Sequence, residues 1–417
     1  MRLPRGAPLN IALEFDITRA RVPAARLAMS DSLAQLEWSP ELIASTLNPA
    51  GLYYPPEPGL HAARTRNFNG LHGFLADALP EGWGYLVMRK RLAELGVDIA
   101  SLTAAEQLAL VGETGRGALV FEPATTPSGE VETLDLDALA DEAALTLSGD
   151  DGNLAETLAK LAGGSGGARP KVHVGFDDAG NVSVGSGEIA PGHTAWIVKF
   201  RAPEDPIDIG PLEYAYASMA RAAGIDVPEH KLIASKKGPG YFATRRFDRP
   251  EPGARLHMLS LSGAIESPPQ TPSSYDTLLR ATRAITRRAD DVAAAFRRMV
   301  FNVLAHNRDD HTRQHAFLMD ESGDWRLAPA YDLTYAAGPG GEHYLDVEGE
   351  GRRPTRVHIE NLAKRHGLSD KQTTVAIDEV RAAISDWEAV AKSAGVSGAS
   401  RKLVAEAHAR VLETFGV

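Results

Sequence analysis

Short stretches of alternating hydrophobic and polar residues open the chain. Between residues 10 and 40 the segments LNIALEF, ARLAM and AQLEW repeat with a period of two, which predicts strands of an antiparallel sheet. From Asn69 to Leu95 the hydrophobic positions take helical spacing, interrupted at Pro80-Glu-Gly-Trp, so we expect two helices joined by a turn. The segment TAAEQLALVGETGRGALVFEP then predicts a helix, a glycine-rich loop and a strand.

A second unit follows a change in composition. The segment ATTPSGEVET predicts a linker, and helical patterns follow at 135–147 and 153–162. Strands are predicted at KVHVGFD, NVSVG and TAWIVKF, and a helix is predicted at PLEYAYASMARAAGI. Two further strands around a Gly-Pro-Gly turn are predicted in HKLIASKKGPGYFATRRFD. After Pro250 the pattern is mainly helical, at 287–306 and through 369–414. We therefore predict three units, at 1–125, 126–250 and 251–417.

Composition narrows the functional classes. The 417 residues are 43% hydrophobic, enough for more than one core. No apolar run approaches the roughly 20 residues of a spanning helix, and the first residues lack the apolar core of a signal peptide, so we expect a cytoplasmic protein without a membrane partner. The absence of cysteine excludes disulfides, thiol catalysis and cysteine-ligated zinc. A net charge of -11 argues against strong DNA binding by this chain alone.

The densest group of charged and histidine residues follows the helix predicted at 287–306. It reads NVLAHNRDDHTRQHAFLMD (302–320), and WRLAPAYDLTY follows at 325–335. Phosphoryl transfer from ATP needs one carboxylate to orient the attacking hydroxyl, a second on magnesium and a cation on the phosphates. Asn307-Arg308-Asp309, with Gln314 five positions after Asp309, has the outline of the kinase catalytic loop H-R-D-x-x-x-x-N. Asp309 is therefore the predicted catalytic carboxylate.

Asp332 is the second carboxylate of this hypothesis. It lies in AYDLTY, where a kinase places the aspartate that binds its metal. The interval from Asp309 leaves room for two strands of about six residues and a turn, and Ser322-Gly323 supplies that turn. Such a hairpin would return Asp332 to the side of Asp309. We therefore predict a magnesium site at Asp332, with Gln314 as a second ligand.

A glycine-rich segment and a lone lysine precede these carboxylates. GGSGGARPK (163–171) contains four glycines before a predicted strand, and glycine lets a loop approach phosphates closely. It is not a Walker A motif, because no Gly-Lys-Ser/Thr ends it. Lys199 ends the apolar strand TAWIVKF, as the phosphate-binding lysine of kinases does, and Glu213 in the next helix could pair with it.

Each motif alone has a simpler interpretation. A Gly/Ser-rich stretch is more often a linker, Lys199 and Glu213 could be solvated residues, and Asp332 could belong to a turn or cap. Their order along the chain is what favours a kinase. A metallohydrolase is the rival, because imidazole with carboxylate suits zinc, iron or manganese. Its cluster would be His306, Asp309, Asp310, His311 and His315.

The rival leaves the glycine-rich segment and Lys199 without a role. We therefore prefer a structural role for His311, which would bond backbone or carboxylate and fix the loop. Asp310 would be either a supporting group behind Asp309 or a solvated loop residue.

The chain resembles the HipA family of toxin–antitoxin kinases over almost its whole length. The resemblance rests on FNGLHGFLADALPEGWG, LVGETGRGALVFEP, GGSGGARPKV, AWIVKF, LEYAYASMARAAGIDVP, RRFDR, RLHMLSLSGAIE, NVLAHNRDDHTRQHAFLMD, LAPAYDLTY and GPGGEHYLDVEGEGRRPT. It implies an α+β fold: a protein-kinase-like core with a mixed, β-rich N-lobe and a helical C-lobe, preceded by an N-terminal α/β domain. It also implies a serine/threonine kinase that uses ATP and Mg²⁺.

The resemblance assigns roles to particular residues. Asp309 corresponds to the catalytic aspartate, Asp332 to the magnesium aspartate, and backbone near Arg245 and Phe247 to the adenine-binding hinge. Ser165 is implied as an autophosphorylation site. The residues assigned to ATP are Gly164, Ser165, Gly166, Gly167, Lys199, Glu213, Arg245, Phe247 and His311.

Partners follow from the same resemblance. It implies a small helix-turn-helix antitoxin of the HipB kind, contact with DNA only through that antitoxin, and a protein substrate such as an aminoacyl-tRNA synthetase. Two positions depart from the family. Gln314 stands where the family has asparagine, and the segment around Ser165 differs in length and composition from the best-known member. A pseudokinase that binds nucleotide and serves as a scaffold or corepressor is therefore the alternative.

Overall fold

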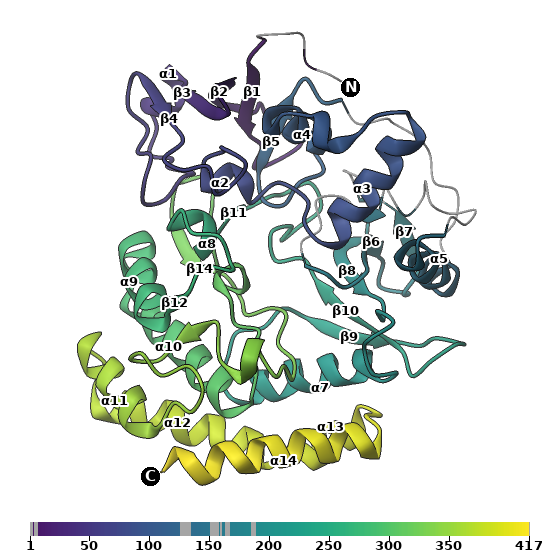
Figure 1. The fold of residues 1–417 in the computed structure, drawn as a ribbon, viewed down its shortest axis with the longest axis vertical. Coiled ribbons are helices and arrows are strands. Elements are labelled where there is room, and N and C mark those ends of the chain that lie inside the picture. Colours follow the sequence, from purple (N-terminus) through teal and green to yellow (C-terminus); the bar gives the residue numbers. More distant parts are fainter. Residues whose placement is uncertain are drawn as a thin grey trace.

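The computed structural model describes Leu3 and residues 7–125, 135–150, 158, 161–162, 167–184 and 189–416. Antiparallel sheets occupy the N-terminal and middle parts of the chain, and helices dominate the C-terminal part (Figure 1). The predicted α+β class is confirmed. The boundaries near residues 125 and 250 stay predictions.

The first sheet has the strand order β4-β3-β2-β1-β5, all antiparallel. Alternation places Leu9, Ile11 and Leu13 of β1 in the core, as the period of two predicts. Its strands are β1 (Leu9–Leu13), β2 (Val22–Ser30), β3 (Leu33–Trp38), β4 (Leu60–Ala62) and β5 (Leu119–Glu122). The accompanying helices are α1 (Pro40–Ile43), α2 (Gly73–Ala76), α3 (Trp83–Glu94) and α4 (Ala104–Val111), besides a 3₁₀ turn at Ile99–Ser101.

The second sheet has the antiparallel order β7-β6-β8-β10-β9. Its strands are β6 (Lys171–Phe176), β7 (Val182–Val184), β8 (Thr194–Lys199), β9 (His230–Ile233) and β10 (Tyr241–Arg245), and helices α5 (Leu136–Ser148) and α7 (Ile209–Ala222) accompany them. The core of this sheet includes Val172 and Val198, and Trp83 and Val87 of α3 pack into it. A helix from the first 125 residues thus covers the second sheet.

The C-terminal part combines helices with short strands. A three-stranded sheet has the order β11-β13-β14, and β12 pairs with β15. These strands are β11 (His257–Ser260), β12 (Ser273–Ser274), β13 (Ala316–Met319), β14 (Trp325–Leu327) and β15 (Leu345–Asp346). The helices are α8 (Leu261–Ala264), α9 (Tyr275–Thr286), α10 (Ala289–Leu304), α11 (Arg356–Arg365), α12 (Asp370–Ser385), α13 (Trp387–Ser393) and α14 (Gly398–Phe415), with 3₁₀ turns at Thr312–Gln314 and Pro339–Gly341.

One hydrophobic core joins distant parts of the chain. It contains Leu9 of the first sheet, Tyr216 of α7, Val300 of α10 and Phe415 of α14. Burial of apolar surface in such a core is the main contribution to the stability of the folded state. In the described part of the chain, no helix combines the length and the apolar character that crossing a bilayer requires.

Most predicted elements near the site are present. The turn at Pro80 separates α2 from α3, and the hairpin after Asp309 turns at Gly323, whose φ of +89° favours glycine. The hairpin strands have four and three residues, shorter than predicted. The last backbone hydrogen bond of the hairpin runs from Ala328 N to Ala316 O. Pro329 follows and has no N–H, so it cannot donate the next bond of the ladder. Most of the predicted linker lies outside the described residues.

Candidate active site

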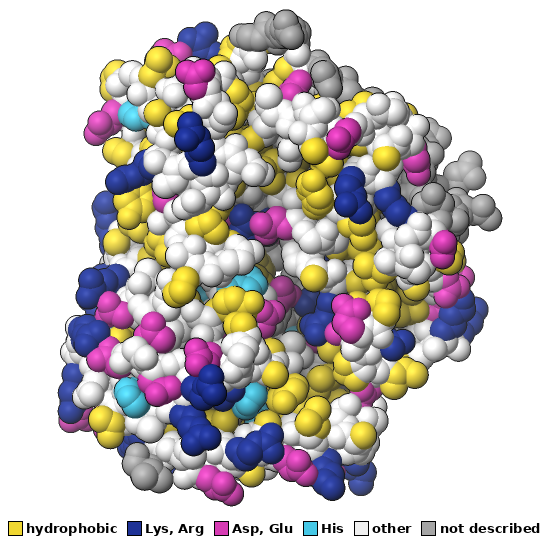
Figure 2. All heavy atoms as spheres, in the orientation of Figure 1, with side chains coloured by type: hydrophobic (Ala, Val, Ile, Leu, Met, Phe, Trp, Pro, Cys, Tyr) yellow, Lys and Arg dark blue, Asp and Glu magenta, His cyan; other side chains and the backbone are white. Residues whose placement is uncertain are grey.

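A pocket of about 340 Å³ lies where the three parts of the chain meet. Acidic, basic and histidine side chains gather around the central hollow of the face in Figure 2. The first 125 residues contribute Glu81, Gly82 and Arg116 to the pocket wall. The second sheet and its continuation contribute Gly167, Lys171, His173, Ile197, Lys199 and residues 244–248. Met258, His311, Arg313, Gln314, Tyr331 and Asp332 line it from the C-terminal part.

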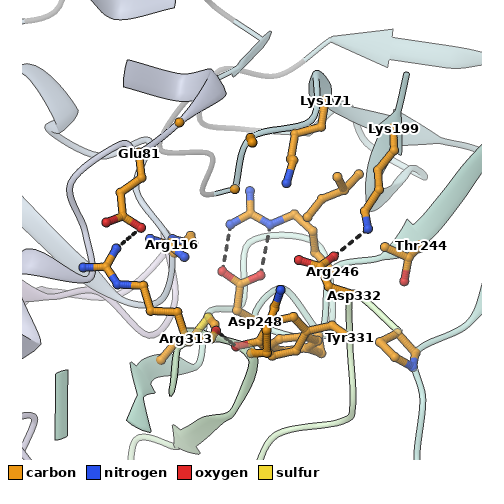
Figure 3. Close-up of a pocket in the computed structure, with 18 of the residues that line it drawn as sticks. Glu81, Arg116, Lys171, Lys199, Thr244, Arg246, Asp248, Arg313, Tyr331 and Asp332 are labelled. Carbon is orange, nitrogen blue, oxygen red and sulfur yellow. Dashed lines mark hydrogen bonds and ion pairs between the residues drawn. The ribbon is translucent and has the colours of Figure 1, made fainter. Parts of the chain in front are cut away.

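Lys199 forms an ion pair with Asp332 in the wall of this pocket (Figure 3). Its Nζ lies 2.9 Å from Glu213 Oε2 of α7 and 2.5 Å from Asp332 Oδ1, so the pairing expected with Glu213 is present. Burial alone would lower the pKa of Lys199, but the two carboxylates raise it above its ordinary value. Lys199 therefore stays charged, and it ties the second sheet to the segment that carries Asp332.

Asp332 occupies an unusual backbone conformation. Its φ of +53° lies in the left-handed region, which a non-glycine residue adopts when surrounding contacts compensate for the strain. Burial would raise the pKa of Asp332, but Lys199 and Lys171 hold that pKa well below its ordinary value. The carboxylate is therefore ionised in the pocket wall, as a metal ligand must be.

Lys171 is a second pocket lysine that our sequence reasoning missed. It faces Lys199 across the β6–β8 pair. Burial lowers the pKa of Lys171 to about 8, and the charge of Lys199 adds to the decrease. The segment GGSGGARPK contained the sequence signal for Lys171 as a pocket residue. A lysine that begins a strand directly after a glycine-rich segment can point into the same space as that segment.

The loop after α10 carries Asp309, whose side chain is 49% exposed. Partial burial of the Asp309 side chain raises its pKa, and the negative charge of Asp332 adds to this increase. His311 acts in the opposite direction and lowers the pKa of Asp309. His311 Nδ1 accepts a bond from Arg313 N at 3.2 Å, so the expected bond from His311 to the loop backbone is present. His311 and Gln314 line the pocket, whereas Asp309 is not among its lining residues.

Asp310 is the buried anchor of this loop. Tyr275 Oη donates to its carboxylate at 2.5 Å, His343 Nδ1 lies 2.7 Å away and Tyr344 N donates at 2.9 Å. Asp310 is fully buried, so the interpretation as a solvated loop residue is wrong. The local sequence around Asp310 could not reveal these partners, because Tyr275 and His343 lie more than thirty residues away from it, one on each side. Asp310 fixes the backbone next to Asp309.

The histidine-rich cluster does not form a metal centre. His306 Nδ1 faces Ala336 O and its ring stacks on Tyr335, whereas His315 is buried beside Tyr275. No group of three or more His, Asp or Glu side chains within the described ranges is placed to hold a metal ion. The metallohydrolase hypothesis therefore lacks its ligand set in this part of the chain.

The segment after β10 forms the opposite wall. Arg245 and Phe247 both line the pocket, and the ring of Phe247 lies 5.5 Å from that of Tyr331. Arg246 also lines it, a residue that the run RRFDR contained but that we did not single out. Asp248 holds Arg246 with bonds of 3.0 and 2.7 Å. The wall thus combines an apolar surface with a fixed cation.

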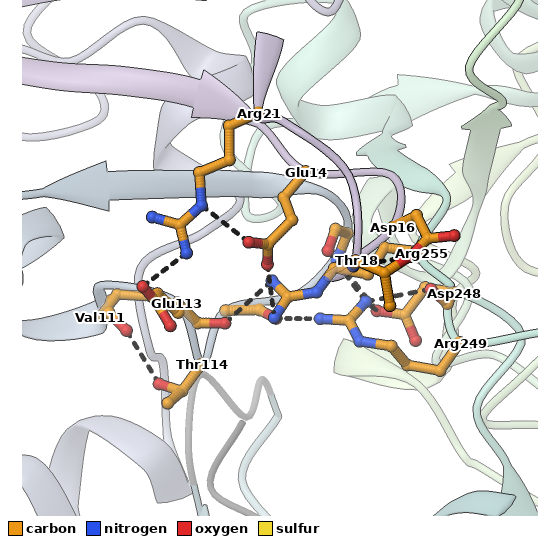
Figure 4. A network of polar contacts seen from close by, with 12 residues as sticks. Glu14, Asp16, Thr18, Arg21, Val111, Glu113, Thr114, Asp248, Arg249 and Arg255 are labelled. Carbon is orange, nitrogen blue, oxygen red and sulfur yellow. Dashed lines mark hydrogen bonds and ion pairs between the residues drawn. The ribbon is translucent and has the colours of Figure 1, made fainter. Parts of the chain in front are cut away.

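A buried ionic network connects this wall to the first sheet (Figure 4). Asp248 also accepts hydrogen bonds from Arg249 and from Gly117 N. Burial would raise the pKa of Asp248, but Arg246 and Arg249 hold that pKa well below its ordinary value. Glu14 pairs with Arg21 at 2.7 Å and with Arg255 at 2.9 Å. Both ends of segment 246–255 are therefore held against the first sheet.

The glycine-rich segment is described only in part. Gly164, Ser165 and Gly166 lie outside the described residues, so their assigned roles stay predictions. Gly167 lines the pocket with a φ of +79°, and its carbonyl accepts a bond from Trp83 N. The end of the segment therefore lies beside Lys171 and Lys199.

Comparisons with known proteins agree with this arrangement. A family model described as the HipA N-terminal domain matches residues 15–122, and one described as the HipA-like C-terminal domain matches residues 163–387. The relative named "Putative kinase Y4dM" from Sinorhizobium fredii is 30% identical over 153 residues, 33% of this chain and 37% of that protein. "Putative kinase Y4mE" from the same organism is 28% identical over 214 residues, 47% of this chain and 45% of that protein. The chain matches less than half of the length of each of these curated relatives.

A solved structure shares the fold. A chain of the Shewanella oneidensis MR-1 complex of HipA, HipB and operator DNA aligns with a TM-score of 0.70 at 17% identity, covering 97% of this chain and 96% of that chain. The expected kinase-like core with an N-terminal domain is confirmed by this match. Because the HipA-like C-terminal model alone spans more than half of the residues, the chain belongs to the HipA family.

Proposed function

We propose that this protein is a serine/threonine kinase that transfers the γ-phosphoryl group of ATP to protein hydroxyls and acts as the toxin of a toxin–antitoxin pair. The observation that carries the proposal is Lys199, held between Glu213 and Asp332 in the wall of a cation-rich pocket. Kinases need this cation on the phosphates, with a carboxylate beside it for the metal.

The pocket fits a nucleotide by volume and chemistry. A volume of about 340 Å³ suits a small-molecule ligand. Ile197, Phe247 and Tyr331 offer the apolar surface that a purine ring needs, while Lys171, Lys199 and Arg246 suit a polyphosphate. The two kinds of surface line the same pocket, as binding of one nucleotide requires.

Magnesium fits the carboxylate and amide that line the same pocket. Oxygen ligands suit this ion, and the ionised Asp332 with the side-chain carbonyl of Gln314 would hold it. A bound magnesium ion neutralises charge on the phosphates during transfer. Asp309 would orient the acceptor hydroxyl and accept its proton, and its half-exposed carboxylate suits a protein substrate that approaches from solvent.

Family membership supports proposals for the substrate, the partner and the location. We propose a translation component such as an aminoacyl-tRNA synthetase as the substrate, and Ser165 as an autophosphorylated residue. A HipB-like helix-turn-helix antitoxin would be the partner, and contact with DNA would pass through it, because the similar solved complex contains HipA, HipB and operator DNA. The net charge of -11 agrees with indirect DNA contact. The cytoplasm is the proposed location.

One observation favours a second function. Gln314 replaces the asparagine expected at the end of the catalytic loop, and its extra methylene could weaken a magnesium site that demands near-ideal geometry. A pseudokinase that binds nucleotide and serves as a scaffold or corepressor would tolerate such a change.

ATP with magnesium is expected to raise the melting temperature of the protein, because a ligand that binds only the folded state stabilises it by mass action. Differential scanning fluorimetry with ATP and magnesium, together with radiolabelled ATP for autophosphorylation, tests both functions. Binding with phosphoryl transfer supports the kinase, and binding without transfer supports the pseudokinase. A tightly held zinc or iron ion with no response to ATP would contradict both.

Gln314→Asn tests the metal shell directly. If the longer glutamine displaces its carbonyl from the octahedral distance of about 2.1 Å, the shorter asparagine restores the ligand, so autophosphorylation should rise and less magnesium should be needed. If the backbone already compensates for glutamine, the same change should lower activity and demand more magnesium. The measurement is the magnesium dependence of the rate in both proteins. Identical rates and curves would contradict a role for Gln314 in metal binding.

A further inference from the structure

The turn at Pro80–Trp83 joins two separate cores beside the pocket. Leu79 is buried in the core shared by the first sheet and the C-terminal helices, whereas Trp83 is fully buried in the core of the second sheet. Both ends of the turn are therefore held rigidly. Glu81 and Gly82 between them line the pocket, and Figure 3 shows Glu81 pointing toward Arg313.

On one side, the turn holds the strand and segment that carry Lys171 and Gly167. Trp83 N donates to Gly167 O at 2.9 Å, and Trp83 Nε1 donates to Lys171 O at 3.0 Å. Gly82 has a φ of +49°, and a Cβ at this position would lie 2.4 Å from Gly167 O. Only glycine permits this approach without a shift of the backbone.

On the other side, the turn holds the catalytic loop. Glu81 Oε2 forms an ion pair with Arg313 Nη1, and the Arg313 side chain is only 9% exposed. Arg313 lies in the 3₁₀ turn Thr312–Gln314, and its carbonyl accepts a bond from Tyr331 Oη at 2.6 Å. Glu81 therefore compensates a mostly buried cation in the turn that also carries Gln314.

We propose that Glu81 is a positioning residue for phosphoryl transfer: from the N-terminal domain it fixes Arg313, and through Arg313 the turn that presents Gln314 to the pocket. This inference rests on the kinase function proposed above and extends it to the N-terminal domain. The other acidic side chains in the described pocket wall are Asp248 and Asp332. Without Glu81, the Arg313 cation would be drawn toward them, because a buried charge needs a partner.

The test is Glu81→Gln, compared with Glu321→Gln. Glu321 pairs with Arg19 and also joins the first domain to the C-terminal part, but both side chains are exposed and neither lines the pocket. We expect Glu81→Gln to lower kcat for phosphoryl transfer about tenfold with the KM for ATP within about twofold, since positioning in the transition state is lost rather than ground-state binding. Glu321→Gln should match the unaltered protein.

Two further variants separate positioning from general stability. Glu81→Asp should recover part of kcat because it keeps the charge. Arg313→Gln should lower kcat, and adding Glu81→Gln to it should cause little further loss, because both changes remove the same interaction. Melting temperatures of all variants should be measured beside the kinetics.

The outcomes distinguish this inference from the proposed function. If the unaltered protein phosphorylates in an Asp309-dependent way but Glu81→Gln keeps full kcat, the positioning role is wrong and the kinase stands. Fully additive losses in the double variant, or a kcat loss matched by Glu321→Gln, would also overturn it. Absence of any ATP-dependent phosphoryl transfer in the unaltered protein would overturn both.

Discussion

Asp309→Asn is expected to lower phosphoryl transfer by roughly several hundredfold or more, a loss typical of removing a main positioning or proton-accepting group. Asparagine keeps the shape of the side chain but cannot accept the proton of the acceptor hydroxyl. The side chain is 49% exposed, so the fold should be unaffected. Radiolabelled ATP assays and toxicity on induction measure the effect.

The matched control is Asp324→Asn. Asp324 is an exposed residue of the turn between β13 and β14, outside the loop that carries Asp309, so this variant should keep full activity and the same melting temperature. Wild-type autophosphorylation in Asp309→Asn would contradict the kinase assignment.

The pH profile gives a second check on Asp309. Burial and the charge of Asp332 raise the pKa of Asp309 above its ordinary value of 3.8. The ionised form is the one that can accept a proton, so kcat/KM should fall as the pH decreases through this raised pKa. An acid limb at or below the ordinary carboxylate range would contradict the raised value.

Lys199→Met is expected to remove nucleotide binding and to destabilise the protein. The variant leaves Glu213 and Asp332 without the cation that lies 2.9 and 2.5 Å from them. Breaking one partner of a buried pair costs about 3 to 5 kcal/mol, and we expect the lower end because Glu213 keeps its ion pair with Arg169 and the Asp332 side chain is 30% exposed. The thermal stabilisation by ATP and magnesium should disappear, and phosphoryl transfer should fall about a hundredfold or more.

The destabilisation should depend on pH in a defined direction. Asp332 has a lowered pKa, so its stabilising contribution is present above 3.8 and is lost as the pH falls toward its folded-state pKa. Lys199 has a raised pKa, so its contribution is present below 10.5 and is lost only at higher pH. The stability difference between the unaltered protein and Lys199→Met should therefore be largest near neutral pH and shrink in acid.

Lys236→Met is the control for this variant, since Lys236 is exposed and does not line the pocket. It should change neither the melting temperature nor the response to ATP. An equal loss of stability in both variants, or a difference independent of pH, would contradict the proposed interaction of Lys199 with the two carboxylates.

Local pattern in the sequence determined the secondary structure of the site. The apolar run in TAWIVKF predicts β8 with Lys199 at its end, helical spacing predicts α10, and Ser322-Gly323 predicts the hairpin turn before Asp332. These features depend on the preferences of neighbouring residues, which act over a few positions. The sequence also placed Lys199, Glu213, Asp309 and Asp332 in an order that predicted a shared site.

Tertiary structure decided which side chains meet. Lys199 contacts Asp332 across 133 positions, and Trp83 contacts Lys171 across 88. Asp310, which looks like a partner of nearby histidines in the sequence, is bound instead by Tyr275 and His343. Glu81 and Arg313, from parts of the chain more than two hundred positions apart, form an ion pair. Such contacts depend on strand register and on the packing of whole elements, and no local periodicity encodes either of them.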